Sequence, residues 1–128
     1  MARYWRLLAH YDAETATYSA CAGAFQTSPY TPDKSGRLKG LRVVVGRVAA
    51  TTLTDEVEFR LTCTTFDPNT IQVMGVGSGL QTAPAFPVPS MDYEVDQPVV
   101  AGVPITIEGR CGNASAVTNA VYLMGLFE

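Results

Sequence analysis

Apolar and polar residues alternate at every second position in several stretches of the chain. In Val57–Thr65 the odd-numbered residues up to position 63 are apolar and the even-numbered residues are polar. In Val103–Cys111 the same spacing recurs, with apolar residues at positions 103, 105, 107 and 111. Side chains of a β-strand point to opposite faces in turn. This period therefore predicts two strands, each with one buried and one hydrated face.

Two other segments, Leu41–Val48 and Ala120–Phe127, are apolar at nearly every position. We expect them to be strands that lie centrally in a sandwich or against another subunit. Weaker patterns predict four further strands, at Arg3–Tyr11, Thr17–Phe25, Thr70–Val76 and Tyr93–Val100. Turn-forming segments such as Phe66-Asp67-Pro68-Asn69 join the strands.

About eight strands and no helical pattern predict an all-β fold. Strands without intervening helices exclude a parallel βαβ architecture and leave an antiparallel β-sandwich or a small barrel. A jelly roll fits about eight strands in 128 residues best. We expect residues 1–128 to form a single β-sandwich domain, because this length suits one hydrophobic core.

The composition is poor in charge. Charged residues make up 16% of the chain and hydrophobic residues 47%, whereas about a quarter of the residues in soluble domains are charged. Either the fold is very compact or part of its surface is covered by a partner, and we favour other copies of the chain, in a homo-oligomer. The net charge of −3 provides no general attraction to nucleic acid or anionic lipid. With no long apolar run or signal peptide, we expect a soluble protein made in the cytoplasm, without membrane contact.

Residue types that carry catalysis or bind metals are scarce. The single histidine, His10, excludes His-rich metal sites, and we expect its ring to be partly solvated at a strand end. The three cysteines, Cys21, Cys63 and Cys111, are too widely spaced for a zinc site or a disulfide framework. We expect them to be small buried apolar residues. The sequence predicts no enzyme, no catalytic residue and no cofactor.

One acidic cluster lies in the predicted strand near residue 93. At strand spacing Asp92, Glu94 and Asp96 project from one face. Our first interpretation is a solvated charged face that guards an edge strand. The alternative is a calcium site, because three carboxylates on one side supply the hard oxygen ligands that Ca²⁺ prefers.

One basic cluster precedes the central strand. It consists of Lys34, Arg37, Lys39 and Arg42. We interpret it as a solvated loop. The alternative is a contact with phosphate or with an acidic neighbour, such as the acidic cluster of another copy. No direct binding of nucleic acid is expected, since aromatic residues do not alternate with these charges.

An apolar segment stiffened by prolines, Pro84–Pro89, lies outside the predicted strands. Exposed apolar surface of this kind usually contacts a partner. The alternative is that the segment folds back over one open end of the sandwich. The interface candidates, taken from this region and from the last predicted strand, are Leu80, Phe86, Val88, Met91, Tyr122, Met124, Leu126 and Phe127. The first strand holds Tyr4, Trp5 and Tyr11, which we interpret as core or interface residues, with a sugar-stacking platform as the alternative.

As an architecture, the chain resembles the small single jelly-roll coat and decoration proteins of viruses, including those of phages and archaeal viruses. The segments behind this resemblance are Arg42–Ala49, Val57–Thr65, Pro84–Pro89, Gly102–Glu108 and Tyr122–Phe127. The resemblance implies a subunit of the virion that assembles with copies of itself, and with other coat subunits, into trimers, pentamers or a shell lattice. It contains no motif from which functional residues can be transferred. Coat proteins that bind the genome directly have a basic arm, which this chain lacks.

Two other functional classes remain open. One is a carbohydrate- or ligand-binding, lectin-like β-sandwich, since Arg3-Tyr4-Trp5-Arg6-Leu7 resembles the start of galactose-binding-like domains of discoidin type. The other is an enzyme on a small barrel of cupin type, which we favour least because cupin metal sites need several histidines.

Overall fold

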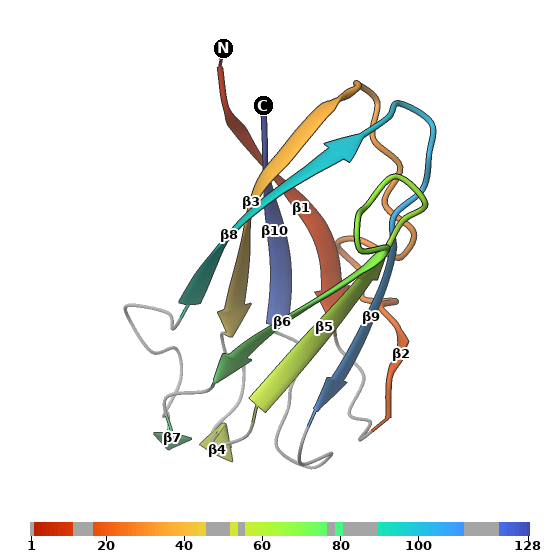
Figure 1. Cartoon of the computed structure of the whole chain (residues 1–128). Coiled ribbons are helices and arrows are strands. Elements are labelled where there is room, and N and C mark those ends of the chain that lie inside the picture. Colours follow the sequence, from red (N-terminus) through yellow and green to blue (C-terminus); the bar gives the residue numbers. More distant parts are fainter. Residues whose placement is uncertain are drawn as a thin grey trace.

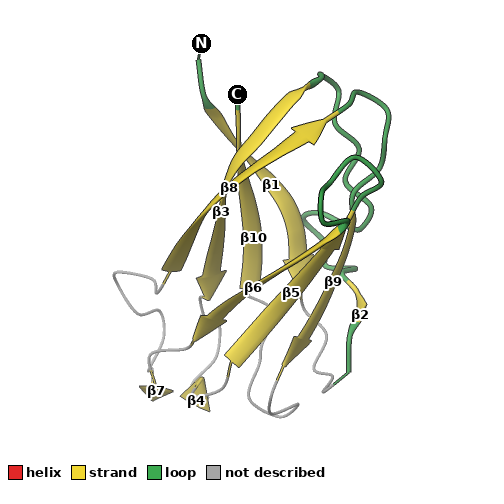
Figure 2. Cartoon of the chain, viewed as in Figure 1, coloured by secondary structure: helices red, strands yellow, loops and turns green. Residues whose placement is uncertain are grey.

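The computed structural model of the chain describes residues 2–11, 17–45, 52–53, 56–76, 79–80, 90–111 and 121–128. Within these ranges every regular element is a strand (Figure 2). The strands are β1 (Tyr4–Tyr11), β2 (Ser19–Ala20), β3 (Gly36–Val45), β4 (Thr52–Leu53), β5 (Glu56–Thr62), β6 (Thr70–Val76), β7 (Gly79–Leu80), β8 (Ser90–Val99), β9 (Thr106–Cys111) and β10 (Val121–Phe127). The described part of the chain includes no helix long and apolar enough to cross a membrane.

Eight of the strands form two four-stranded sheets, which face each other in Figure 1. The first sheet has the order β1-β10-β3-β8 and the second has the order β2-β9-β5-β6, while β4 and β7 form a separate short pair. Four antiparallel pairs join the two halves of the chain, namely β1 with β10, β2 with β9, β3 with β8 and β5 with β6. Successive pairs lie in alternate sheets, as in a long hairpin wrapped around a core. This topology is a jelly roll, so the expected fold class is confirmed.

The core lies between the two sheets, where the alternation of the sequence places it. On β5 the side chains of Val57, Phe59 and Leu61 have no exposed surface, and on β9 Ile107 is equally buried. The Phe59 ring meets the Tyr11 ring of β1 edge to face, with centroids 6.1 Å apart. The predicted buried face of Val57–Thr65 is therefore correct.

Two glycines let the sheets approach each other closely. A Cβ atom added at Gly75 of β6 would lie 2.5 Å from Val43 Cγ1 of β3. A Cβ atom added at Gly109 of β9 would lie 2.6 Å from Tyr11 Cδ1 of β1. Because a real Cβ atom does not fit at such distances, these glycines make room for large side chains of the opposite sheet.

Two predicted strands differ most from the strands of the structure. The predicted strand Leu41–Val48 corresponds to β3, which begins five residues earlier, at Gly36, and is described as far as Val45. Arg37 and Lys39 are charged, so the residues before Leu41 look like a loop in the sequence. The predicted strand Thr17–Phe25 contains only the two-residue β2, because residues 21–28 turn back against β1.

His10 is buried, with 3% of its surface exposed, so the expectation of a partly solvated ring is wrong. The segment that turns back covers it. The Gly23 amide donates to the His10 carbonyl at 2.9 Å, and the His10 amide donates to the Gln26 carbonyl at 3.0 Å. The imidazole stacks on the Tyr122 ring, with centroids 4.8 Å apart. Sequence patterns could not show this, since the cover comes from a distant turn.

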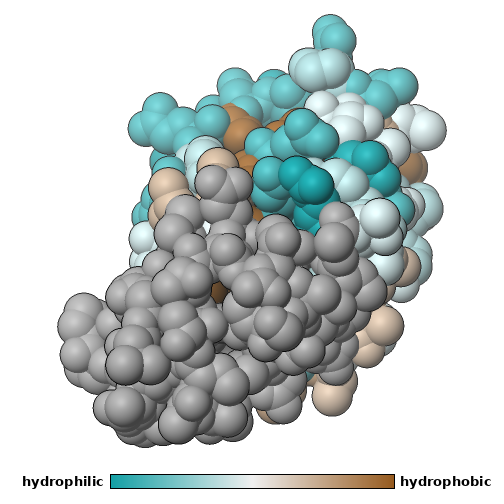
Figure 3. Space-filling model, turned by 90° about the horizontal axis from the view of Figure 1, so that it is seen from below, coloured by the Kyte–Doolittle hydropathy of each residue, from teal (hydrophilic) through white to brown (hydrophobic). Residues whose placement is uncertain are grey.

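Two of the three cysteines can be compared with the expectation. Cys21 and Cys63 are buried, as expected, with 1% and 3% of their surface exposed. The side chain of Cys111 lies outside the described residues. Figure 3 shows the molecule from the end at which described strands meet the grey residues. Around the grey atoms, the described surface in this view is mainly hydrophilic with small apolar areas.

Candidate functional site

The outer face of the second sheet is a surface of paired charges. Arg60 lies 2.8 Å from Glu108, and Arg110 forms an ion pair with Glu58. The Tyr18 ring lies against both guanidinium groups, 4.1 Å from Arg60 Cζ and 5.4 Å from Arg110 Cζ. The hydrogen bond from Arg110 lowers the pKa of the Glu58 carboxyl, and a hydrogen bond from Tyr18 lowers it further. Such a face is well suited to water.

The outer face of the first sheet is different, because half-buried apolar side chains run along it. On β10 the inward residues are buried and the residues between them are only half-buried. The strand register places Trp5 and Leu7 of β1 and Val44 of β3 beside these outward residues. We call this set the apolar strip, and its members are Trp5, Leu7, Val44, Tyr122, Met124 and Leu126.

Three of the interface candidates, Tyr122, Met124 and Leu126, thus lie on the outer face of the sheet. Met91 is 41% exposed at the start of β8. Phe86 and Val88 lie outside the described residues, as does the side chain of Leu80.

Phe127 was predicted to lie in the interface, but the structure places it in the core. It is 3% exposed, and its ring stacks between those of Tyr4 and Tyr30, at centroid distances of 5.8 Å to each. Phe127 is therefore a core residue of a single chain. The aromatic residues of the first strand lie in different environments. Tyr11 is wholly buried, whereas Trp5 is on the outer face of the sheet.

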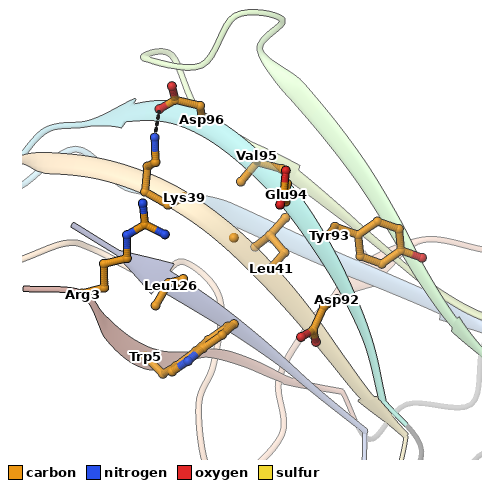
Figure 4. Close-up of a pocket in the computed structure, with 11 residues that line it drawn as sticks. Arg3, Trp5, Lys39, Leu41, Asp92, Tyr93, Glu94, Val95, Asp96 and Leu126 are labelled. Atoms are coloured by element: carbon orange, nitrogen blue, oxygen red, sulfur yellow. Dashed lines mark ion pairs between the residues drawn. The ribbon is translucent and has the colours of Figure 1, made fainter.

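A groove of about 800 Å³ opens at one end of the apolar strip (Figure 4). Gly40 pairs with Leu126 on one side and with Glu94 on the other. Because glycine has no side chain, the sheet is hollow at this point. Figure 4 shows Trp5 and Leu126 on one side of the groove, and the Tyr93 ring turned away from it.

The charged residues beside the groove pair with one another across β3 and β8. The Arg42 guanidinium donates two hydrogen bonds to Asp92, at 2.7 and 2.9 Å, and this contact lowers the pKa of that carboxyl. Arg37 hydrogen-bonds Asp96, and Lys39 lies 3.4 Å from the same carboxylate. Arg37 is the main cause of a lowered pKa at Asp96.

These pairs correct the interpretation of the basic cluster. Arg37, Lys39 and Arg42 belong to strand β3 rather than to a loop, and their acidic neighbours are in the same chain rather than in another copy. Lys34 lies apart from them, with its ammonium nitrogen 5.9 Å from the centre of the Tyr4 ring.

The acidic residues of β8 are exposed and project from one face, as their spacing predicts. Two of the three, Asp92 and Asp96, form ion pairs with basic residues of β3. Within the described ranges, no group of three or more histidine, cysteine, aspartate or glutamate residues is placed to hold a metal ion. Salt bridges therefore join the outer faces of β3 and β8. Glu94 lies beside the hollow at Gly40.

One surface residue was missed in the sequence. Phe25, which the pattern placed inside a strand, is 70% exposed in a turn. Its ring lies 5.2 Å from that of His10 and 6.3 Å from that of Tyr122, so it extends the apolar strip beyond Tyr122. The turn formers that flank it, Gly23 and Ser28-Pro29, are the signal that could have revealed its position.

Comparison with known proteins adds little. No protein family model matches the chain, and no curated protein matches it. Among solved structures, a crystal structure of the infectious bursal disease virus VP2 subviral particle aligns with 98% of this chain, at 14% identity and a TM-score of 0.39. A structure of infectious bursal disease virus, Gx strain, also covers 98% of it, at 10% identity and a TM-score of 0.36.

The chain spans 31% and 30% of the length of those two chains. The likeness is loose, and the jelly-roll assignment rests on the strand order of this chain alone.

Proposed function

We propose that the protein is a structural subunit of a virion, a coat or decoration protein that self-assembles through the outer face of its first sheet. The observation that supports this proposal is the difference between the two outer faces. Both faces have ion pairs, but the outer face of the first sheet has the apolar strip in addition. A jelly roll is compatible with this function, since viral capsid domains use it, but lectin domains and cupins use it too.

Covering the apolar strip with a partner is favourable in free energy. Burial of apolar surface gains roughly 25 cal/mol per Å², and the half-buried side chains of the strip still expose such surface in a single chain. Arg42, which the register places beside Met124 on this face, is already paired with Asp92 of the same chain. A partner that covers this face therefore leaves few charges without a counter-ion, which is the usual cost of burying a charged surface.

The test is the mass of the protein in solution. Size-exclusion chromatography with light scattering, over a range of concentrations, should show association, and negative-stain microscopy should show discrete particles. Leu126→Asp should reduce the mass to that of one chain, because it places a charge in the strip. The matched control is Thr106→Asp, which adds the same charge at an exposed position on the outer face of the second sheet. A wild-type protein that stays monomeric at all concentrations contradicts the proposal.

The groove favours a second candidate function, the binding of a carbohydrate. Its lining combines an indole with hydrogen-bond donors and acceptors, including Trp5, Lys39 and Glu94, and sugar hydroxyls need both. The Arg42 guanidinium lies 4.4 Å from the centre of the Trp5 ring and covers one of its faces. A sugar must therefore stack on the other face.

Trp5 is the only tryptophan of the chain, so its fluorescence reports directly on the groove. Titration with a panel of neutral oligosaccharides distinguishes the two functions. A monomer whose emission changes with a saturable dependence on one sugar supports the second function and contradicts the first. Association without any response to sugars supports the first.

A further inference from the structure

The exposed ring of Phe25 stands on a well-fixed backbone. The turn around it forms backbone hydrogen bonds with β1 on both sides, through Gly23 and Gln26 to His10. The Phe25 amide itself donates to His10 Nδ1 at 3.3 Å. A large aromatic ring that is 70% exposed on such a support has the features of an interface anchor, since little conformational entropy is lost when it is covered.

The groove and the Phe25 ring lie at opposite ends of the same face. Phe25 adjoins Tyr122, near the start of β10, whereas the groove adjoins Leu126, near its end. These two residues of β10 are four positions apart, about 13 Å at the rise of a strand. Met124 lies midway between them on the outer face.

We propose that two copies of the chain pack their first sheets face to face, with their β10 strands antiparallel, and that each inserts Phe25 into the groove above Gly40 of the other. This inference rests on the proposed function and names the contact that it uses. A twofold axis that runs between the two sheets, at right angles to β10 and over Met124, places the Phe25 end of one copy over the groove end of its partner. The contact is then reciprocal, as an isologous interface requires.

The occupant is a second copy because one face of the chain holds both a projecting ring and a hollow. The hollow exists because position 40 is glycine, between Leu126 and Glu94. Its charged border is largely neutralised within the chain by the pairs of Asp92 and Asp96. A neutral aromatic ring adds no further charge to this groove. Packed sheets lie about 10 Å apart, which leaves room for one interdigitated layer of side chains.

Position 40 has room for the Cβ atom of a larger residue. A Cβ atom added at Gly40 would lie 3.4 Å from Leu126 Cβ and 3.5 Å from the Tyr93 carbonyl oxygen, which are tolerable contacts. Gly40→Leu therefore keeps the strand and places a side chain in the hollow. Phe25→Ala removes the ring, and the fold should tolerate the change because the ring is mostly exposed. The matched control is Val100→Ala, which trims an apolar side chain that is 43% exposed outside this face.

The experiment measures the dissociation constant of the dimer by analytical ultracentrifugation. Phe25→Ala and Gly40→Leu should each weaken association by about tenfold or more, the usual effect of removing an aromatic anchor. The double variant should lose little beyond either single variant, because both changes abolish the same contact. Val100→Ala should bind like the wild type.

The outcomes separate this inference from the proposed function. If Leu126→Asp abolishes association while Phe25→Ala and Gly40→Leu leave it intact, the face is an interface and the Phe25 contact is wrong. If the effects of Phe25→Ala and Gly40→Leu simply add, the ring binds somewhere other than the groove, and the inference is also wrong. If Leu126→Asp has no effect either, the proposed function fails as well.

Discussion

The Tyr93 hydroxyl donates a hydrogen bond to the Met74 carbonyl at 2.6 Å and accepts one from the Met74 amide at 3.3 Å. A side chain of β8 in one sheet thus binds both backbone groups of a residue on β6, an edge strand of the other sheet. Gln97 does the same at Asp67, accepting from its amide at 2.8 Å and donating to its carbonyl at 3.1 Å. Since unpaired backbone groups on an edge strand invite aggregation, β8 protects the open side of the sandwich.

Tyr93→Phe should lower the free energy of unfolding by about 1–2 kcal/mol, because it leaves the Met74 backbone groups without this partner. Urea denaturation measures the loss, and hydrogen exchange at the Met74 amide should become faster. The control is Tyr122→Phe, which removes a hydroxyl for which the described residues show no hydrogen bond. Equal losses in the two variants would contradict this account of Tyr93.

The interior glycines should differ sharply in their tolerance of a methyl group. Gly75→Ala and Gly109→Ala should each destabilise the fold by about 1–3 kcal/mol, because the added carbon overlaps Val43 or Tyr11 of the opposite sheet. Gly40→Ala should cost much less, since its Cβ atom meets neighbours only at 3.4 Å or more. Thermal unfolding of the three variants checks this order, and a reversed order would refute the close approach of the sheets.

The ion pairs of the second sheet make stability depend on pH. The folded chain lowers the pKa of Glu58, chiefly through the hydrogen bond from Arg110. The stabilisation of the folded chain by the Glu58–Arg110 pair is therefore complete above the pKa of an unfolded glutamate, about 4.3. It is lost as the pH falls through the lower folded-state pKa.

Glu58→Gln should therefore reduce the part of the acid destabilisation that occurs below about pH 4.3. Urea midpoints recorded between neutral and acid pH measure this slope. Glu94→Gln is the control, because Glu94 lies apart from these pairs. If the urea midpoints of Glu58→Gln and of the wild type fall in parallel as the pH is lowered, the pair contributes nothing to the loss of stability at acid pH.

Substitutions at the neighbouring residues Leu126 and Phe127 of β10 should affect different properties, namely association and stability. Phe127→Ala should destabilise the fold by about 3–5 kcal/mol, as large-to-small changes in a core do, because its ring is held between Tyr4 and Tyr30. Leu126→Asp should change the oligomeric mass and leave the urea midpoint of the monomer nearly unchanged. The two measurements, made on both variants, separate core from interface. Equal stabilities of the two variants would contradict the assignment of Phe127.

The strands that were predicted best are those whose alternation is enforced by burial on one face. Val57–Thr65 follows this rule, and the structure places its odd-numbered residues in the core. The predicted strand Thr70–Val76 coincides with β6. Such segments are predictable because the period of two is a local property of the chain.

Features that depend on register could not be predicted from one sequence. The pairing of Arg42 with Asp92 joins residues 50 positions apart, and no local pattern selects that partner. For the same reason the hollow at Gly40 was missed, since its neighbours Leu126 and Glu94 belong to other strands. The burial of His10 was missed because a turn from outside its strand provides the cover.

The position of β10 has a consequence for biosynthesis. This strand is the last of the ten described strands, yet it lies between β1 and β3 in the first sheet. Until the ribosome has released residues 121–127, both of those strands lack the neighbour that satisfies their backbone groups. Arg3 and Glu128, which close the sheet with an ion pair, are 125 positions apart. From the synthesis of β1 to that of β10 the nascent chain therefore has unpaired strand edges, and its yield should depend on chaperones and on low temperature during expression.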